Sequence, residues 1–369
     1  MLTIAGVAGV TGQFSCNSLA PQCSCSSYPD TFYELLCPQF MVRFSFNDRV
    51  DLQCNSMERL DYTVLSGLRF GDVQMFMLSL CPLPNASVRV VMDSIGINKI
   101  EMLQIQSYRN LSDSLQKKHF EKLSDVTKLS LSNNGLRYLP SDLFEDMGNL
   151  TWLDLKFNNI ILPKEIFYST PKLEVLELGR NNLTHLPPGI FKNLDRLKLL
   201  QLWSNNLVNL TRAVFSDVPN LLHLDLNTNG LETIRLDLFA DLVKLKTLNL
   251  YGNYFNSLPQ GLLSRNIDLE TFQMQENKGY LLTLPSGLLS NLTKLKVVRV
   301  SGCKLTYLPE DVFSGSNRIE NLYLNRNSLS SLGENIFLDL EDLEVLDLSE
   351  NVMTHLPKKL FPLQRDWKL

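Results

Sequence analysis

The residues whose types and spacing could carry chemistry in this sequence are its cysteines. Six of the seven lie in the first 81 residues, at Cys16, Cys23, Cys25, Cys37, Cys54 and Cys81. Cys23 and Cys25 could form half of a zinc site, but the paired C-x-x-C spacing of zinc knuckles is missing and no histidine is nearby. Such a cluster favours disulfides and an oxidising, extracellular compartment. Among the fifteen connectivities that six cysteines allow, we favour the pairs Cys16–Cys25, Cys23–Cys37 and Cys54–Cys81.

No other residues suggest catalysis or a bound metal. The four histidines are scattered along the chain, at His119, His185, His223 and His355. The sequence contains no Gly-rich phosphate loop, no His-Glu metal motif and no nucleophile elbow. We therefore expect a protein that is not an enzyme and that binds no cofactor or metal.

The charge balance argues against nucleic acid and membrane partners. The chain carries 35 basic and 39 acidic residues, a net charge of −4, without a block of Lys or Arg. No apolar run reaches the ~18 to 20 residues that a membrane-spanning helix needs. The sequence predicts no nucleic-acid partner and no membrane segment in this chain.

A long periodic region follows the cysteines and must form the scaffold. Its phrase is L-x-x-L-x-L-x-x-N-x-L, in copies that begin at Val126, Leu150, Leu173, Leu197, Leu221, Leu245, Leu269, Leu295, Ile319 and Leu343. The spacing of 23, 24 or 26 residues is typical of leucine-rich repeats. The ninth position is Asn in nine copies and Cys303 in the other, which we interpret as a buried structural thiol.

The repeat motif L-x-x-L-x-L-x-x-N-x-L accounts for the formation of a solenoid. The L-x-L core has the period of two that predicts a short strand, and the following N-x-L turns the chain away. An inward-facing Asn can satisfy turn backbone groups that would otherwise be buried unpaired. One copy is too small to be stable alone, so the copies must stack. The predicted fold class is an α/β solenoid, a leucine-rich repeat horseshoe with a parallel concave β-sheet and a disulfide-stapled N-terminal cap.

Four segments follow from this pattern. Residues 1–15 are apolar and rich in small residues, which fits either a truncated secretion signal or a disordered N-terminus. Residues 16–99 form the cysteine-rich cap, where alternation predicts one half-buried strand through Phe40, Val42, Phe44 and Phe46. Residues 100–361 hold one irregular and ten regular repeats. Residues 362–369 form a tail without a cap, so we expect the natural chain to continue.

One copy departs from the regular length. The copy that begins at Leu269 carries two extra residues around Lys278-Gly279-Tyr280. This insertion predicts a local bulge, which either binds a partner or only loosens the coil.

The cap and several repeats resemble the ectodomain of insect Toll receptors. The cap carries C-x6-C-x-C-x11-C-P from Cys16 to Pro38, then VDLQCN at residues 50–55 and LRFGDVQM ahead of Cys81. The repeats contribute QLWSNNLVNLT at residues 201–211, LPQGLLSRN at residues 258–266 and TLPSGLL at residues 283–289. Together these similarities extend over nearly the whole chain.

The resemblance implies the extracellular part of an innate immune and developmental receptor. Its partner would be a secreted cystine-knot cytokine of the Spätzle type, bound by the cap and the concave face of the early repeats, with a receptor homodimer forming on ligand binding. Family members continue into a transmembrane helix and a cytoplasmic signalling domain, which are absent here. A secreted decoy and a matrix or adhesion protein are the alternatives.

Strand positions that the core does not use predict the partner's contact surface. The candidates are Met102, Lys128, Trp152, Phe157, Arg180, Leu199 and Trp203. Aromatic residues and Arg are common interface anchors, although scattered exposed aromatics need no functional explanation.

Glycosylation sequons occur at Asn85, Asn110, Asn149, Asn182, Asn209 and Asn291. The four in regular repeats fall outside the strand positions. Sugars at these sites would leave the concave face open to a protein.

Overall fold

A computed structural model describes residues 23–28, 32–45, 48–55, 62–65, 68–107, 111, 115–357 and 360. The chain divides into two compact units, an N-terminal unit (Met1–Glu177) and a C-terminal unit (Leu178–Leu369), and each is described by itself. The predicted signal segment, Cys16, Phe46, Asn110 and the tail at 362–369 lie outside the described residues.

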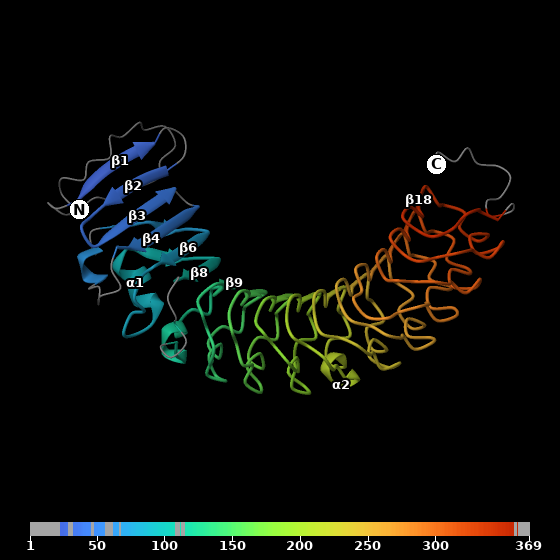
Figure 1. The fold of residues 1–369 in the computed structure, drawn as a ribbon. Helices are drawn as coiled ribbons and strands as arrows, with labels where there is room; N and C mark the ends of the chain where they lie inside the picture. Colours follow the sequence, from blue (N-terminus) through green and yellow to red (C-terminus); the bar gives the residue numbers. More distant parts are fainter. Residues whose placement is uncertain are drawn as a thin grey trace. The chain divides into compact units, whose positions relative to one another are not determined.

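The N-terminal unit contains a sheet that changes from antiparallel to parallel pairing (Figure 1). Neighbours from β1 to β4 are antiparallel, and β4 then pairs in parallel with β6. The strands β8, β9, β10 and β11 extend it in parallel. The bounds are β1 Ser24–Tyr28, β2 Phe32–Leu36, β3 Phe40–Ser45, β4 Arg49–Cys54, β6 Met75–Ser79, β8 Met102–Gln106, β9 Lys128–Ser130, β10 Trp152–Asp154 and β11 Val175–Glu177.

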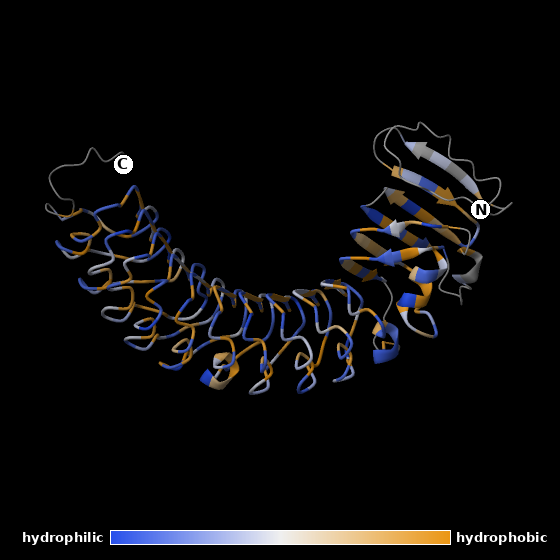
Figure 2. Cartoon of the chain, turned by 180° about the vertical axis from the view of Figure 1, so that it is seen from behind, coloured by the Kyte–Doolittle hydropathy of each residue, from blue (hydrophilic) through white to orange (hydrophobic). Residues whose placement is uncertain are grey.

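Alternation along these strands separates a buried face from an open one. The register aligns Val42, Leu52, Leu78 and Ile105, and all four are at most 2% exposed. Phe40 and Phe44 of β3 are also buried, which confirms the predicted half-buried strand for its described residues. Hydrophobic and hydrophilic residues are both present along the cap strands in Figure 2, and burial alternates along β3, β4, β6 and β8. Every second side chain is therefore available to face a partner.

Short elements cover the buried face of the cap. Helix α1 begins after Ser87, whose hydroxyl accepts a hydrogen bond from Arg89 N at 3.1 Å, and it buries Val88, Val91 and Met92. Gly96 follows with φ +64°, where a Cβ would lie 2.9 Å from Arg69 Cα. The elements are η2 Tyr62–Leu65, α1 Val88–Ser94, η3 Lys117–Phe120 and a parallel pair of β5 Gly71–Asp72 with β7 Ile97–Lys99.

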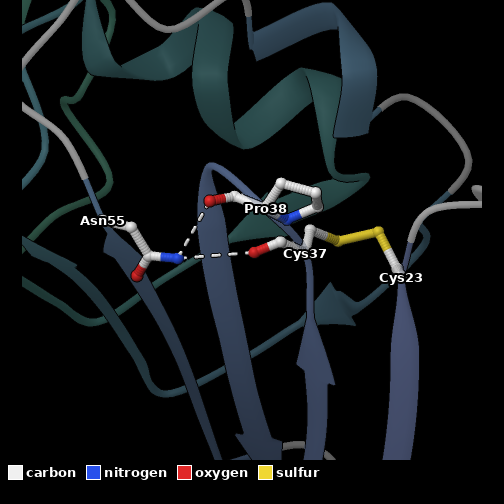
Figure 3. Close-up of a disulfide and its surroundings, with 4 residues drawn as sticks. All are labelled: Cys23, Cys37, Pro38 and Asn55. Carbon is white, nitrogen blue, oxygen red and sulfur yellow. Dashed lines mark hydrogen bonds between the residues drawn. A yellow bond between two sulfur atoms is a disulfide. The ribbon is translucent and has the colours of Figure 1, made fainter.

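Two of the favoured disulfides are present, Cys23–Cys37 and Cys54–Cys81. The third, Cys16–Cys25, involves a residue outside the described part. Asn55 follows Cys54, and its Nδ2 donates to Cys37 O at 3.4 Å and Pro38 O at 3.3 Å (Figure 3). This amide ties the end of β4 to the turn between β2 and β3, which gives the Asn of VDLQCN a structural role.

The C-terminal unit is a stack of similar coils, each contributing one short strand to a parallel sheet (Figure 1). The strands are β12 Leu199–Gln201, β13 His223–Asp225, β14 Thr247–Asn249, β15 Thr271–Gln273, β16 Val297–Arg299, β17 Asn321–Tyr323 and β18 Val345–Asp347. Turns form most of the opposite side of each coil, with one short helix, α2 (Arg212–Phe215), among the described residues. The predicted solenoid of stacked parallel strands is confirmed.

The ninth-position amides bridge successive coils. Asn205 Nδ2 donates to Leu178 O at 3.1 Å and Leu202 O at 2.9 Å. Its Oδ1 accepts from the backbone N–H groups of Asn181 and Leu183, both at 3.0 Å. One buried side chain thus satisfies turn groups of its own coil and of the preceding coil.

Cys303 takes the place of one such amide. Its thiol donates to Met274 O at 3.0 Å, and its backbone N–H donates to Asn327 Oδ1 at 2.9 Å. Burial raises the pKa of the Cys303 thiol to about 12. The predicted buried structural thiol is confirmed.

We expect Asn205→Ala to lower the free energy of unfolding by ~1–3 kcal/mol, because buried N–H and C=O groups lose their partner. The matched control is Asn206→Ala, an exposed neighbour, which should change it by less than about 0.5 kcal/mol. Denaturant unfolding followed by circular dichroism measures both values. Equal losses would contradict the bridging role of the amide.

The thiol of Cys303 should be inert in the folded protein, because the reactive thiolate is suppressed by burial. Iodoacetamide at about pH 8 is expected to leave it unmodified in the folded protein and to label it in denaturant. Peptide mass spectrometry measures the labelled fraction. Equal labelling rates in the two states would contradict this environment.

Candidate ligand-binding site

The open face of the N-terminal unit carries two aligned rows of side chains. The first row is Arg49, Met75, Met102, Lys128 and Trp152. The second row is Arg43, Asp51, Met77, Gln104, Ser130 and Asp154. Along β4, β6 and β8 these positions alternate with buried residues, so both rows lie on the side of the sheet opposite the core, although Ser130 and Asp154 at the end of the second row are themselves buried. We call this surface the open face.

Strand pairing brings three of the predicted contact residues together. Met102 is aligned with Lys128, and Lys128 with Trp152, on three adjacent strands. The fourth predicted residue of this unit, Phe157, follows β10 with φ +56° and is exposed. A continuous surface on β8 to β10 therefore contains the predicted cluster.

Two further methionines on this face, Met75 and Met77, were missed when the sequence was considered alone. Met75 and Met77 are half-buried on β6, beside Met102 on β8. Arg49 Nη2 lies 3.1 Å from Met77 Sδ. Thioether side chains are flexible and polarisable, and they adapt to the shape of a partner. Residues 75–79, MFMLS, are apolar at the first four positions, so the sequence holds no alternation that would have placed these methionines on the open face.

Ion pairs surround the methionines. Arg49 Nε contacts Asp51 Oδ1 at 2.6 Å, and Arg43 Nη2 contacts Glu34 Oε1 at 3.1 Å. Lys128 Nζ contacts Glu101 Oε1 at 2.7 Å. Since each of these cations has an acidic neighbour, the feature of the open face that is left without a partner is its apolar area, formed by the adjacent methionines and by Trp152 beyond Lys128.

Trp152 is held in place by a network with the next coil. Its indole Nε1 donates to Glu177 Oε1 at 2.9 Å, and Lys156 Nζ donates to Glu177 Oε2. Asp154 accepts from Lys156 N at 3.0 Å and from Ser130 Oγ at 3.1 Å. Burial raises the pKa of Asp154 above its ordinary value. The ring is thus oriented before any partner arrives.

The other predicted contact residues lie in the C-terminal unit. The indole of Trp203 covers Gly179, because a Cβ added to that glycine would lie 2.4 Å from Trp203 Cε2. The indole Nε1 of Trp203 donates to Gln201 Oε1 at 3.2 Å. Arg180 is exposed, and its N–H donates to Trp203 O at 2.9 Å. Leu199 is half-buried on β12. The predicted set therefore forms two clusters, one within each unit.

The predicted sugar sites differ in their surroundings. Asn85, Asn182, Asn209 and Asn291 are exposed. Asn149 instead donates from Nδ2 to Ser124 O at 2.7 Å and accepts from Lys172 Nζ at 2.6 Å. Asn220, which is not in a sequon, makes the same contacts with Asp195 O and Lys244 Nζ, so this position has a structural use in the repeat.

The described part of the chain contains no cluster of acidic, His or Cys side chains that could hold a metal ion. Within that part, no helix is long and apolar enough to cross a membrane.

Comparison with known proteins assigns the family. The leucine rich repeat model matches residues 98–160, 162–202, 195–255 and 317–364, which together exceed half of the chain. The chain belongs to the leucine-rich repeat family.

Within this family the chain is Toll-like, as the cap motifs predicted. It is 34% identical to the Toll protein of Drosophila melanogaster over 181 residues, which cover 47% of this chain and 16% of that relative. The structure of the glycosylated Drosophila Toll–Spätzle complex matches with a TM-score of 0.84 and 33% identity, over 95% of this chain and 48% of that chain. The leucine-rich repeat domain of APL1B matches with a TM-score of 0.54 and 29% identity, over 66% of each chain. This chain thus spans about half of the solved Toll chain.

The stability of the folded chain should depend on pH through Asp154. Its raised pKa means that the folded state binds this proton more tightly than the unfolded chain does, so the buried charge opposes folding above the raised value. The penalty disappears as pH falls towards the ordinary value of 3.8.

Asp154→Asn keeps an Oδ1 acceptor for Lys156 N and removes the charge. We expect a higher melting temperature than wild type at neutral pH and a difference that shrinks as pH falls towards 3.8. Differential scanning fluorimetry across this range measures it. A difference independent of pH would show that charge burial is not the cause.

Proposed function

We propose that the N-terminal unit binds a Spätzle-type cystine-knot cytokine through its open face. The chain would then act as the extracellular ligand-binding part of a Toll-type immune and developmental receptor. The observation that carries the proposal is the aligned row of Met75, Met102, Lys128 and Trp152, in a chain similar to a Toll that was solved with Spätzle.

The open face has the properties of a protein interface. A central apolar area surrounded by charged groups is the usual arrangement, and the apolar centre contributes most of the affinity. The paired charges around the methionines would contribute mainly to orientation and association rate. In the described residues of this unit, the sequon positions Asn85 and Asn149 lie outside the strands, so attached sugars would not cover this face.

The setting agrees with such a partner. The Toll similarity and the disulfides indicate an extracellular location. The resemblance to Toll receptors implies a dimeric cytokine, so one ligand would offer two equivalent surfaces, and a receptor homodimer around it is part of the proposal.

The double variant Met75→Ala/Met102→Ala removes two side chains that are aligned on adjacent strands. We expect it to weaken binding of a processed Spätzle-type cytokine by about tenfold or more, since buried apolar anchors dominate such interfaces. Biolayer interferometry with the secreted chain measures the dissociation constant.

The matched control is Thr271→Ala/Val297→Ala, an aligned pair at the same repeat position in the C-terminal unit. This control should bind like wild type. Equal weakening in both variants would move the site away from the open face. A folded wild-type chain that shows no binding at about micromolar cytokine would exclude this class of ligand.

A further inference from the structure

A second surface lies on the side of the C-terminal unit, at the insertion in the copy that begins at Leu269. It consists of Tyr254, Lys278, Tyr280, Leu282, Lys304 and Tyr307, which we call the lysine–tyrosine flank. Tyr280 is 74% exposed, Tyr307 56%, Leu282 55% and Tyr254 41%. Side chains of this size and exposure, gathered on consecutive coils, leave an apolar area facing water.

Backbone contacts hold the flank together. Lys278 N donates to Asn253 O at 2.8 Å, and Tyr280 N donates to Asn256 Oδ1 at 2.9 Å. On the next coil, Thr306 N donates to Leu282 O at 2.8 Å, and Thr283 forms a parallel bridge with Tyr307. The insertion is therefore anchored on both sides and does not loosen the coil.

Gly279 fixes the direction of the insertion. A Cβ at this position would lie 2.3 Å from both Tyr254 O and Phe255 O. Only glycine allows the chain to pass so close to the preceding coil. The flanking Lys278 and Tyr280 are consequently directed away from the core, and both are exposed.

Two positive charges lie on this apolar surface. Lys278 Nζ is 5.2 Å from the centre of the Tyr254 ring, and Lys304 Nζ is 4.7 Å from that of Tyr280. Lys304 Nζ also donates to Lys278 O at 2.9 Å. Cation–π contact orients each ammonium group without neutralising it.

Other lysines of the same unit are neutralised. Lys246, Lys294 and Lys296 pair with Glu270, Asp268 and Glu320. Within the described residues, no carboxylate pairs with Lys278 or Lys304. Glu276 is the acidic residue closest in sequence to Lys278. Its carboxylate lies against Gly302 instead, where Oε1 would be 3.0 Å from a Cβ added to that glycine.

No sugar site covers the flank. The asparagines beside it belong to Asn253-Tyr-Phe, Asn256-Ser-Leu and Asn277-Lys-Gly, none of which is a sequon. Exposed tyrosines with uncompensated lysines therefore remain accessible on the secreted chain.

We propose that the lysine–tyrosine flank is a docking site for an acidic segment of a second protein. Carboxylates of that segment would pair with Lys278 and Lys304, while an apolar side chain between them packs on Tyr280, Leu282 and Tyr307. Tyrosine is favoured at the centre of protein interfaces, and opposite charges add specificity. A polyanionic glycan would find only two cations here, each already oriented by a ring, so a polypeptide fits the surface better.

A random peptide library displayed on phage tests this proposal. The library is panned on the secreted wild-type chain after depletion on Lys278→Ala/Tyr280→Ala/Lys304→Ala. We expect the recovered peptides to carry Asp or Glu on both sides of an apolar residue. A synthetic copy should lose at least about tenfold in affinity on the triple variant and should weaken in about 0.5 M salt.

The matched control is Leu236→Ala/Lys246→Ala/Lys296→Ala, which removes an exposed apolar side chain and two paired lysines from the same unit. It should bind the peptide like wild type. Recovery of no flank-dependent peptide, or of peptides without acidic residues, would overturn the proposal. The chain could also bind heparin through Lys278 and Lys304 while the library yields no acidic peptide. That result would assign the flank to a glycan and would also overturn the proposal.

The cytokine assay separates this proposal from the previous one. The triple variant should bind a Spätzle-type cytokine like wild type, because the open face is unchanged. Loss of cytokine binding in this variant would place the flank in the cytokine site and remove the need for a second partner.

Discussion

Satisfying the buried turn groups of each coil is the constraint on which the rest of the structure depends. Each coil buries backbone groups that no strand neighbour reaches, and the ninth-position amide reaches them. Asn229 accepts from Leu207 N at 3.1 Å and donates to Leu202 O and Leu226 O, both at 3.0 Å. Because these bonds join one coil to the next, they also fix the register of the strands. Rows of side chains on the sheet follow directly from that register.

Because the inward side chains stabilise the coil, the outward strand positions can vary. Inward leucines and amides provide the stability of a coil, so the strand positions between them are not needed for folding. The chain uses them differently in its two units. In the N-terminal unit, Trp152 and Lys156 are fixed by Glu177, which would lower the entropic cost of the proposed binding. In the C-terminal unit, Lys278 and Lys304 are oriented by tyrosine rings and keep their charge.

The sequence could predict what depends on one copy, and it failed where two copies meet. The strand positions and the amide positions follow from local spacing. The pairs Cys23–Cys37 and Cys54–Cys81 were favoured among fifteen connectivities, which spacing alone does not decide. The packing of Trp203 on Gly179 does not, because it requires the exact approach of two coils. Met75 and Met77 escaped notice because their position depends on the change from antiparallel to parallel pairing beside β4. Local patterns contain no signal for such a change.

The amide series changes its hydrogen-bond pattern at the same coils that carry the lysine–tyrosine flank. Asn253 donates to Leu226 O and Leu250 O, whereas Asn277 donates to Phe255 O at 2.8 Å. On the following coil Cys303 supplies a thiol donor and cannot match the acceptor capacity of an amide. The two extra residues enter between these positions, where the repeat rule is already relaxed. The insertion departs from the repeat pattern although its backbone is anchored to both neighbouring coils. Such a departure serves something other than the stability of the coil, and here it exposes Lys278 and Tyr280.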